Sequence, residues 1–267
     1  MRRYSLAYLT AASLSVPQML AAAARLGYQT VGLRLHPNAP GAQHQPLLGD
    51  AATLREAVAV QRDTGVGVFD LEIIRLAEGF DPEVYRPLLE AGAALGAKAV
   101  LVAGDDLNEA RLTDNYARLC AFMQPFGMTA DLEFMPWTAV PNAQVALRVV
   151  TAAGRPANAG ILVDALHFAR SSSTLDDLRA IPPGLLHYAQ ACDAADGTGF
   201  TTDQLIHTAR CDRLLPGEGV IDVAAIFAAL PGNLPVSVEV PNHARAPRVG
   251  DVEWSRAALA ATQGVLG

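Results

Sequence analysis

The sequence is short of cysteine and of long apolar runs, and each shortage excludes a class of protein. Three cysteines occur in 267 residues, with no CxxC spacing and an odd one left over. No disulfide framework is expected, and the thiols fit a reducing compartment such as the cytoplasm. No apolar run approaches the ~18 residues that a membrane span needs, so no membrane partner is expected. The opening MRRYSLAYLT is too short and interrupted to predict a secretion signal.

Basic residues are also in the minority. The chain has 20 Lys and Arg against 27 Asp and Glu, a formal net charge of −7. Proteins that bind DNA or RNA need a basic surface for the phosphates, so no nucleic-acid partner is expected. The GxGxxG fingerprint is absent after the first apolar run, which counts against a dinucleotide-binding open sheet.

Short apolar runs alternate with amphipathic segments along the whole chain. The runs predict strands at residues 3–9, 29–35, 65–71, 97–103, 128–134, 161–163, 185–191 and 235–240. Between them lie helix-capping signals at Ser15, Asp50, Asp81, Asn108 and Thr174. Strands that alternate with helices form a parallel sheet with right-handed crossovers. Eight such units predict an α/β fold, a single-domain (β/α)8 TIM barrel over residues 1–267, with a doubly wound open sheet as the alternative.

Four of the predicted strands bring an oxygen-bearing side chain to their carboxyl ends, namely Glu133, Asp164, Gln190 and Glu239. In a barrel these ends meet at one face, so one shared site is expected. Three carboxylates close together repel one another, and a divalent cation relieves that repulsion. Oxygen ligands without cysteine favour Mn²⁺, Mg²⁺ or Co²⁺. The alternative is that these groups are strand-end polar side chains satisfied by backbone hydrogen bonds.

Further candidates follow the same strand ends. His167, three residues after Asp164, either reaches the cavity or only supports it; histidine titrates near neutral pH. Arg75 and Arg213 are candidate substrate-binding residues, because a guanidinium binds anionic or polar groups through forked hydrogen bonds. Arg34 and His36, at the top of the second strand, are two more.

Some features stay open on the sequence alone. Glu72 is either a metal ligand or the buried partner of an arginine, and Trp137 either lines the cavity or only packs. Residues 37–49 are expected to form a loop over the barrel mouth. The segment 193–217 is longer than the ~2–6 residues usual for such a connection and is expected to be a functional lid or disordered.

The strand-end motifs LEF (Glu133), VDALH (Asp164, His167), QACDA (Gln190), RLLPGEG (Arg213) and SVEVPN (Glu239) together resemble the xylose isomerase-like TIM barrels. This superfamily is also called the sugar phosphate isomerase/epimerase superfamily, and the resemblance spans the chain. It implies that Glu133, Asp164, Gln190 and Glu239 bind one divalent metal ion. It also implies that both glutamates move protons, that His167 contacts substrate, and that a homo-oligomer is possible.

The expected function is a metal-dependent isomerase or epimerase that removes a proton next to the carbonyl of a small polyhydroxylated ketone or sugar. Gln190 stands where many sugar epimerases have His. Together with the run Arg75-x-x-Glu78-Gly79, it is similar to bacterial 3-dehydroshikimate dehydratases. A metal-dependent dehydratase of 3-dehydroshikimate or inosose type is therefore an alternative, and a barrel that only binds a ligand is a third.

Overall fold

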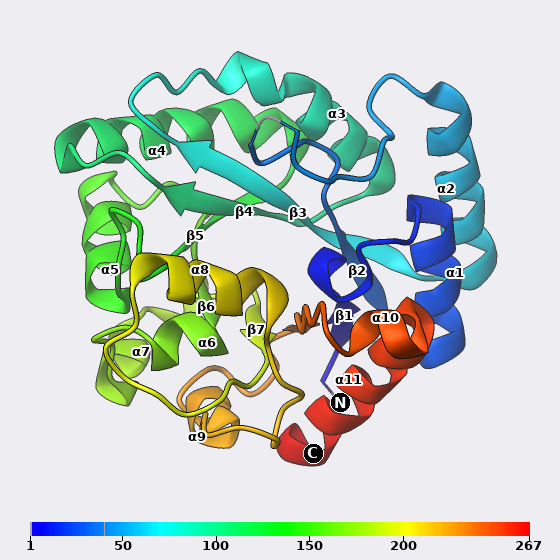
Figure 1. The fold of residues 1–267 in the computed structure, drawn as a ribbon. Helices are drawn as coiled ribbons and strands as arrows, with labels where there is room; N and C mark the ends of the chain where they lie inside the picture. Colours follow the sequence, from blue (N-terminus) through cyan, green and yellow to red (C-terminus); the bar gives the residue numbers. More distant parts are fainter. Residues whose placement is uncertain (1, 40) are drawn as a thin grey trace.

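The strands pair in sequence order, each parallel to the next, and the last pairs with the first to close a barrel (Figure 1). The computed structural model describes residues 2–39 and 41–267. The strands are β1 Tyr4–Leu6, β2 Thr30–Leu33, β3 Gly67–Leu76, β4 Ala99–Gly104, β5 Thr129–Glu133, β6 Ala159–Asp164, β7 Ala189–Ala191 and β8 Val236–Val238. The predicted TIM barrel is confirmed, and the open-sheet alternative is wrong.

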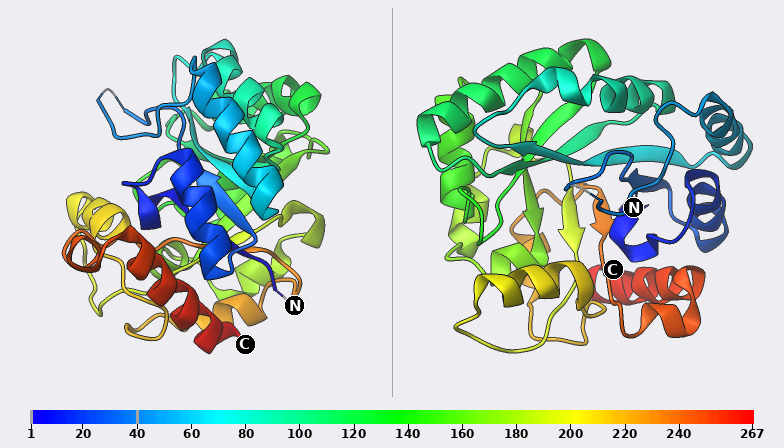
Figure 2. Two further views of the ribbon diagram at one scale, coloured as in Figure 1. Left: turned by 90° about the vertical axis from the view of Figure 1, so that its right-hand side faces the viewer. Right: turned by 45° about the horizontal axis from the view of Figure 1, so that its top comes forward.

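Helices surround the barrel on its outer side (Figures 1 and 2). They are α1 Val16–Leu26, α2 Ala51–Thr64, α3 Arg86–Leu95, α4 Glu109–Met123, α5 Ala143–Ala152, α6 Ala165–Ala169, α7 Leu175–Ala180, α8 Thr202–Cys211, α9 Val223–Ala228, α10 Ala246–Val249 and α11 Asp251–Leu266. Four short 3₁₀ helices are Tyr8–Ala11, Pro82–Tyr85, Gln124–Phe126 and Pro183–Leu185. Across residues 2–39 and 41–267, no helix has the length and apolar character needed to cross a membrane.

The predicted capping residues explain where many of these helices begin. The side chains of Ser15, Asp50, Asn108 and Thr174 accept hydrogen bonds from backbone N–H groups of α1, α2, α4 and α7. Asp81 caps the 3₁₀ helix Pro82–Tyr85, which leads into α3. Each bond satisfies an N–H group that has no partner inside the first turn.

The core divides at the sheet. The large apolar cluster packs the inner faces of the helices against the outer face of the barrel, with residues such as Leu20, Leu88, Tyr116 and Trp254. A smaller cluster with Leu101, Leu162 and Tyr188 lies apart from it. Leu162 lies two residues before Asp164 on β6 and so faces the same side of the sheet, which places this cluster in the barrel interior below the polar site.

The structure corrects several predicted boundaries. β3 continues to Leu76 past a register shift, with Arg75 paired to Ala103 of β4, so Glu72 and Arg75 lie within the strand rather than after it. The strands β1, β7 and β8 have three residues each, shorter than predicted. The segment 193–217 is neither disordered nor a plain loop, because it contains α8. His167 lies on the short helix α6 rather than on a turn.

Candidate active site

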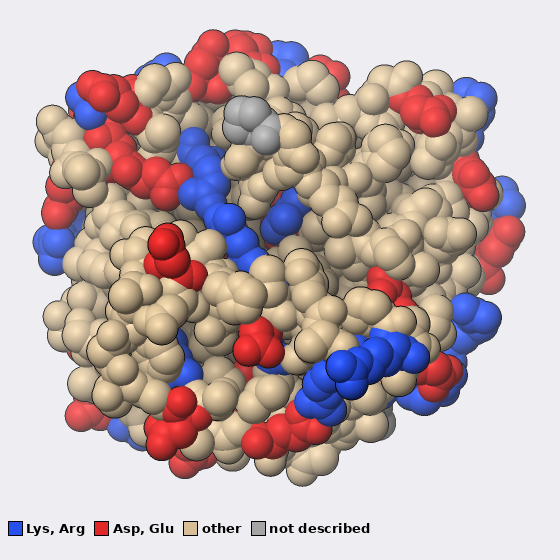
Figure 3. All heavy atoms as spheres, in the orientation of Figure 1, with Lys and Arg blue, Asp and Glu red and all other residues tan. Residues whose placement is uncertain are grey.

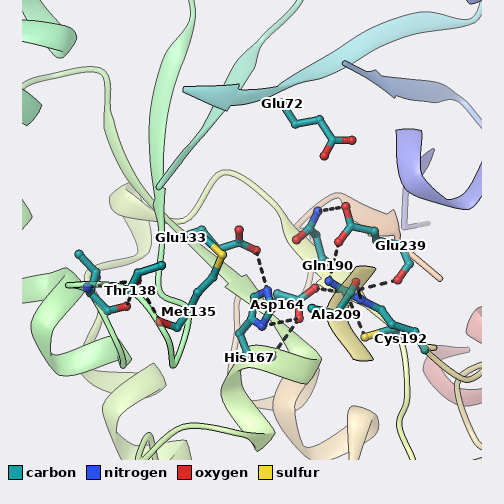
Figure 4. Close-up of polar contacts among 12 residues, drawn as sticks. Glu72, Glu133, Met135, Thr138, Asp164, His167, Gln190, Cys192, Ala209 and Glu239 are labelled. Carbon is teal, nitrogen blue, oxygen red and sulfur yellow. Dashed lines mark hydrogen bonds and ion pairs between the residues drawn. The ribbon is translucent and has the colours of Figure 1, made fainter. Parts of the chain in front are cut away.

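The four polar side chains at the strand ends converge on one buried cluster (Figure 4). Glu133 ends β5, Asp164 ends β6, Gln190 lies in β7 and Glu239 follows β8 directly. None of the four is more than 3% exposed. Because neighbouring parallel strands end at the same face, each strand delivers one polar group to the same place.

Arg213 provides the positive charge inside this cluster. Its Nη1 lies 2.6 Å from Asp164 Oδ2 and its Nη2 lies 2.8 Å from Glu239 Oε2. Its Nε donates to the carbonyl oxygen of Ala209 at 2.9 Å. The side chain is 2% exposed, so the guanidinium is directed at the carboxylates. Arg213 also lines the cavity, and its contact with substrate stays a prediction.

Gln190 is oriented with its amide nitrogen toward one carboxylate and its oxygen free. Nε2 donates to Glu239 Oε1 at 3.1 Å, whereas Oε1 is buried and has no hydrogen-bond partner within residues 2–39 and 41–267. A buried acceptor without a partner costs free energy unless something else satisfies it. The orientation leaves a neutral oxygen available to a cation.

His167 is held beside the carboxylates. Its backbone N–H donates to Asp164 Oδ1 at 3.0 Å, and its Nε2 lies 3.8 Å from Glu133 Oε1. Trp137 packs edge-on against the imidazole with ring centroids 5.0 Å apart, and it also lines the cavity. Burial lowers the pKa of His167 to about 4, so the ring is neutral at physiological pH. The Nδ1 atom is buried and has no partner in the described chain.

Burial dominates the ionisation of the carboxyl groups. It raises the pKa of Glu133 well above its usual value, helped by the negative charges of Asp164 and Glu239. It raises the pKa of Glu239 to about 8, although Arg213 opposes the rise. Burial also disfavours the charged form of Asp164, but Arg213 and His167 together outweigh it through charge and hydrogen bonds, and the pKa of Asp164 is lowered. One carboxylate is therefore fixed as ionised, and two can take up protons.

These shifts predict that the metal-free protein loses stability as pH rises from 6.5 to 8. In this window native Glu239 (pKa about 8) and Glu133 retain protons that the unfolded chain has released. Each excess native proton lowers the free energy of unfolding by about 1.4 kcal/mol per pH unit. The raised pKa of His187, beside Asp131, acts in the same direction. His167 acts in the opposite direction, but only between its pKa of about 4 and its ordinary value of 6.5.

Urea unfolding of EDTA-treated protein at several pH values would measure this slope. The Glu239→Gln variant serves as the control, since it cannot take up that proton and should show a shallower slope. A free energy of unfolding that rises with pH over this range would contradict the expectation.

The cluster meets the chemical requirements of a divalent cation site. Ligand atoms of Glu133, Asp164 and His167 lie within 4.8 Å of one another. Two carboxyl groups with raised pKa values and the free amide oxygen of Gln190 are polar groups that a cation would satisfy. Hard oxygen donors of this kind suit Mg²⁺ or Mn²⁺.

Basic side chains gather around the mouth above the cluster, where Figure 3 shows a hollow with blue atoms at its edge. Arg34 pairs with Glu72 at 2.7 Å, which identifies Glu72 as the buried partner of an arginine. Arg75 pairs with Asp105. His36 packs against the ring of Tyr85 and is not among the residues that line the cavity, and its role in substrate binding stays a prediction.

Sequence reasoning missed Arg210, which α8 carries to the edge of the cavity. Across the described ranges 2–39 and 41–267, it forms no ion pair with a carboxylate. Burial, and then the positive charges of Arg75 and Arg34, lower its pKa. An amphipathic pattern in residues 202–211 could have located the helix, but not the direction of this side chain.

The free space between the cavity-lining side chains is about 50 Å³. A water molecule in the liquid occupies about 30 Å³, so this is room for an ion or a water rather than for a sugar. Small-molecule sites usually measure about 300–1,000 Å³.

Asp193 holds the PGEG segment, residues 216–219, in place through hydrogen bonds to its backbone. Its Oδ2 accepts hydrogen bonds from the backbone N–H groups of Gly217 and Gly219, both at 2.9 Å. Its Oδ1 accepts from Ile221 N at 2.9 Å and from Ala194 N at 2.8 Å. A Cβ at Gly219 would lie 2.1 Å from a backbone oxygen, so only glycine fits there. The segment that follows Arg213 is thereby held in one conformation.

Comparison with known proteins gives this geometry a family. The family model described as "Xylose isomerase-like TIM barrel" matches residues 20–262. The chain belongs to this family. As the sequence resemblance implied, the xylose isomerase-like fold extends over nearly the whole chain. By sequence alone, the chain has no significant match among the curated proteins.

Solved structures share the xylose isomerase-like fold at low sequence identity. An IolI protein with a bound zinc atom has a TM-score of 0.80 and 19% identity, and the match covers 99% of this chain and 98% of that one. AsbF of Bacillus anthracis, described as a probable 3-DHS dehydratase, has a TM-score of 0.76 and 14% identity, with 98% of each chain covered. A D-allulose 3-epimerase from Methylomonas sp. has a TM-score of 0.70 and 15% identity, covering 99% and 98%. At these identities the likeness shows the fold alone.

Proposed function

We propose that this protein is a divalent-metal-dependent isomerase or epimerase that removes a proton next to the carbonyl group of a small polyhydroxylated ketone or sugar. One observation carries the proposal. Two buried glutamates with raised pKa values, Glu133 and Glu239, line one cavity, and Glu239 accepts a hydrogen bond from Gln190, whose amide oxygen has no partner among the described residues. A site that only binds a ligand has no need of two such proton carriers.

Glu133, Asp164, Gln190 and Glu239 would hold the ion, with Mn²⁺, Mg²⁺ or Co²⁺ as candidates. When bound, such an ion is a Lewis acid that polarises a carbonyl oxygen and acidifies the neighbouring C–H group. The zinc atom in the IolI structure belongs to a protein of the same fold and supports a metal site at the barrel mouth.

The side chains of the chain would then carry the proton. One glutamate takes the proton from the carbon beside the carbonyl, and the other returns a proton to a different face or carbon. Carboxyl groups whose pKa values are raised toward neutrality suit this exchange, because proton transfer is most efficient when the pKa lies near the working pH. His167 is neutral and lines the cavity, where its imidazole can donate a hydrogen bond to a substrate oxygen on which negative charge develops.

A dehydratase of 3-dehydroshikimate type is the second candidate, and Arg210 favours it. Dehydration begins with the same proton removal and continues with loss of a β-hydroxyl group. A 3-dehydroshikimate molecule carries a carboxylate, whereas a neutral keto-sugar or inosose does not. Arg210 lines the cavity without a carboxylate partner in the described chain, and a substrate anion would supply that partner.

Two assays with Mn²⁺-loaded protein test the proposal. Keto-sugars in deuterated water should gain deuterium at the carbon beside the carbonyl, which NMR detects. With 3-dehydroshikimate, a rise in ultraviolet absorbance would report an aromatic product and would favour the dehydratase. Activity of either kind should vanish with EDTA and return with Mn²⁺. If the protein binds Mn²⁺ but catalyses neither reaction, the barrel that only binds a ligand becomes the better hypothesis. Oligomeric state stays a prediction from the family resemblance.

A further inference from the structure

Arg213 is the largest of the fully buried side chains in the described chain, and its contacts hold it in place. Besides its pairs with Asp164 and Glu239, its Nη1 lies 3.3 Å from Cys192 Sγ and from the backbone carbonyl of Glu239. Its Nε donates to Ala209 O in the last turn of α8. Its backbone N–H donates to Pro241 O at 2.9 Å. Together these contacts fix the position of the guanidinium.

Asp164 and Glu239 each contact Arg213 through one carboxylate oxygen, and the second oxygen of each has a different partner. Arg213 uses Oδ2 of Asp164 and Oε2 of Glu239. Oδ1 of Asp164 faces the backbone N–H of His167, and Oε1 of Glu239 faces the amide of Gln190. The arginine therefore contacts only one oxygen of each carboxylate.

The charges of the cluster balance only when Arg213 is counted. Ionised Glu133, Asp164 and Glu239 carry three negative charges, and a divalent cation supplies two positive ones. The amide of Gln190 adds no charge. Arg34 is already paired with Glu72. One negative charge is left over, and Arg213 supplies the positive charge that balances it. An unbalanced charge in a buried site costs free energy.

We propose that Arg213 is an internal counter-cation of the metal site, a positioning residue that holds Asp164 and Glu239 together before the metal binds and neutralises the residual charge afterwards. This inference rests on the proposed metal-dependent function. The two oxygens that it binds are fixed before any ligand enters.

Thermal melting of metal-free and Mn²⁺-saturated protein tests this role. In Arg213→Met, which keeps the length of the side chain without its charge, the melting temperature should fall much more in the metal-free form. Mn²⁺ should then raise the melting temperature by a larger increment than in the wild type, because it supplies positive charge that is missing. Titration calorimetry should show Mn²⁺ binding about tenfold tighter, as linkage between binding and stability requires. Arg213→Lys keeps the charge and should restore most of the metal-free stability.

Arg111→Met is the matched control, since Arg111 pairs with the buried Asp106 away from the cluster. Its melting temperature should fall equally with and without Mn²⁺. Equal losses in both forms of Arg213→Met would mean that Arg213 only packs, and would overturn the inference while leaving the proposed function intact. If Arg213→Met does not fold without metal, Arg213→Lys provides the test. A large loss of stability in Arg213→Lys, with the same Mn²⁺-induced rise in melting temperature as in the wild type, would also overturn the inference. A wild-type protein that binds no Mn²⁺ overturns both.

Discussion

Replacing either Glu133 or Glu239 by glutamine should lower kcat/KM by about 10²–10⁴-fold, because general acid–base catalysis by one group contributes this much. Glutamine keeps the shape and one oxygen of the side chain but cannot carry a proton. Both glutamates are buried in the same cavity, so solvent cannot readily replace either one. The loss should persist at saturating Mn²⁺, which separates proton transfer from metal affinity.

The measurement is the rate of solvent-deuterium incorporation into a keto-sugar that the wild-type protein accepts. Glu218→Gln is the control, because Glu218 pairs with Arg245 at the surface and lies outside the cavity. It should retain wild-type activity. Near-normal turnover in both Glu133→Gln and Glu239→Gln would contradict the proton-transfer mechanism.

Removing the carboxylate of Asp193 should destabilise the fold by more than about 3 kcal/mol, since each hydrogen bond to a charged group contributes about 1.5–3 kcal/mol and four such bonds are lost. Asp193 is 1% exposed and accepts four backbone hydrogen bonds. Asp193→Ala loses all four. Asp193→Asn keeps the shape but turns an N–H₂ group toward backbone donors, so a substantial loss is expected there too.

Urea unfolding of these variants gives the free energies. Asp222→Ala is the comparison, because Asp222 caps α9 at the surface through one hydrogen bond to Ala225 N. Its loss should be about 1 kcal/mol, the usual cost of removing an N-cap. A similarly small loss in Asp193→Ala would show that the PGEG segment holds its conformation without the carboxylate.

The barrel could be predicted from the sequence because its signals are local. Parallel strands buried on both faces appear as short apolar runs, and capping residues mark the helices between them. The exact strand lengths could not be predicted. Strand pairing ends where the neighbouring strand ends, and β7 with three residues illustrates this. In β3 the polar residues Glu72 and Arg75 concealed a strand that continues to Leu76.

The candidate site was predictable to the extent that a polar residue after an apolar run indicates a strand end. What each side chain contacts was not predictable in this way. Arg213 meets Asp164 across 49 residues of sequence, and nothing local to either residue indicates the contact. Arg210 reaches the mouth only because 202–211 is a helix. His36 packs against Tyr85, which belongs to the 3₁₀ helix Pro82–Tyr85. The sequence around His36 does not indicate this contact.

The pairing of β1 with β8 has a consequence for how the protein is made. Tyr4, Ser5 and Leu6 pair with Val236, Ser237 and Val238, and Thr10 bonds to Val238 and Val240 across 228 and 230 residues. These contacts cannot form until β8 has left the ribosome, so β1 waits with an unpaired edge throughout synthesis. Unpaired edges invite aggregation, and contacts this distant in sequence form slowly. The nascent chain is therefore expected to depend on chaperones until its last strand emerges.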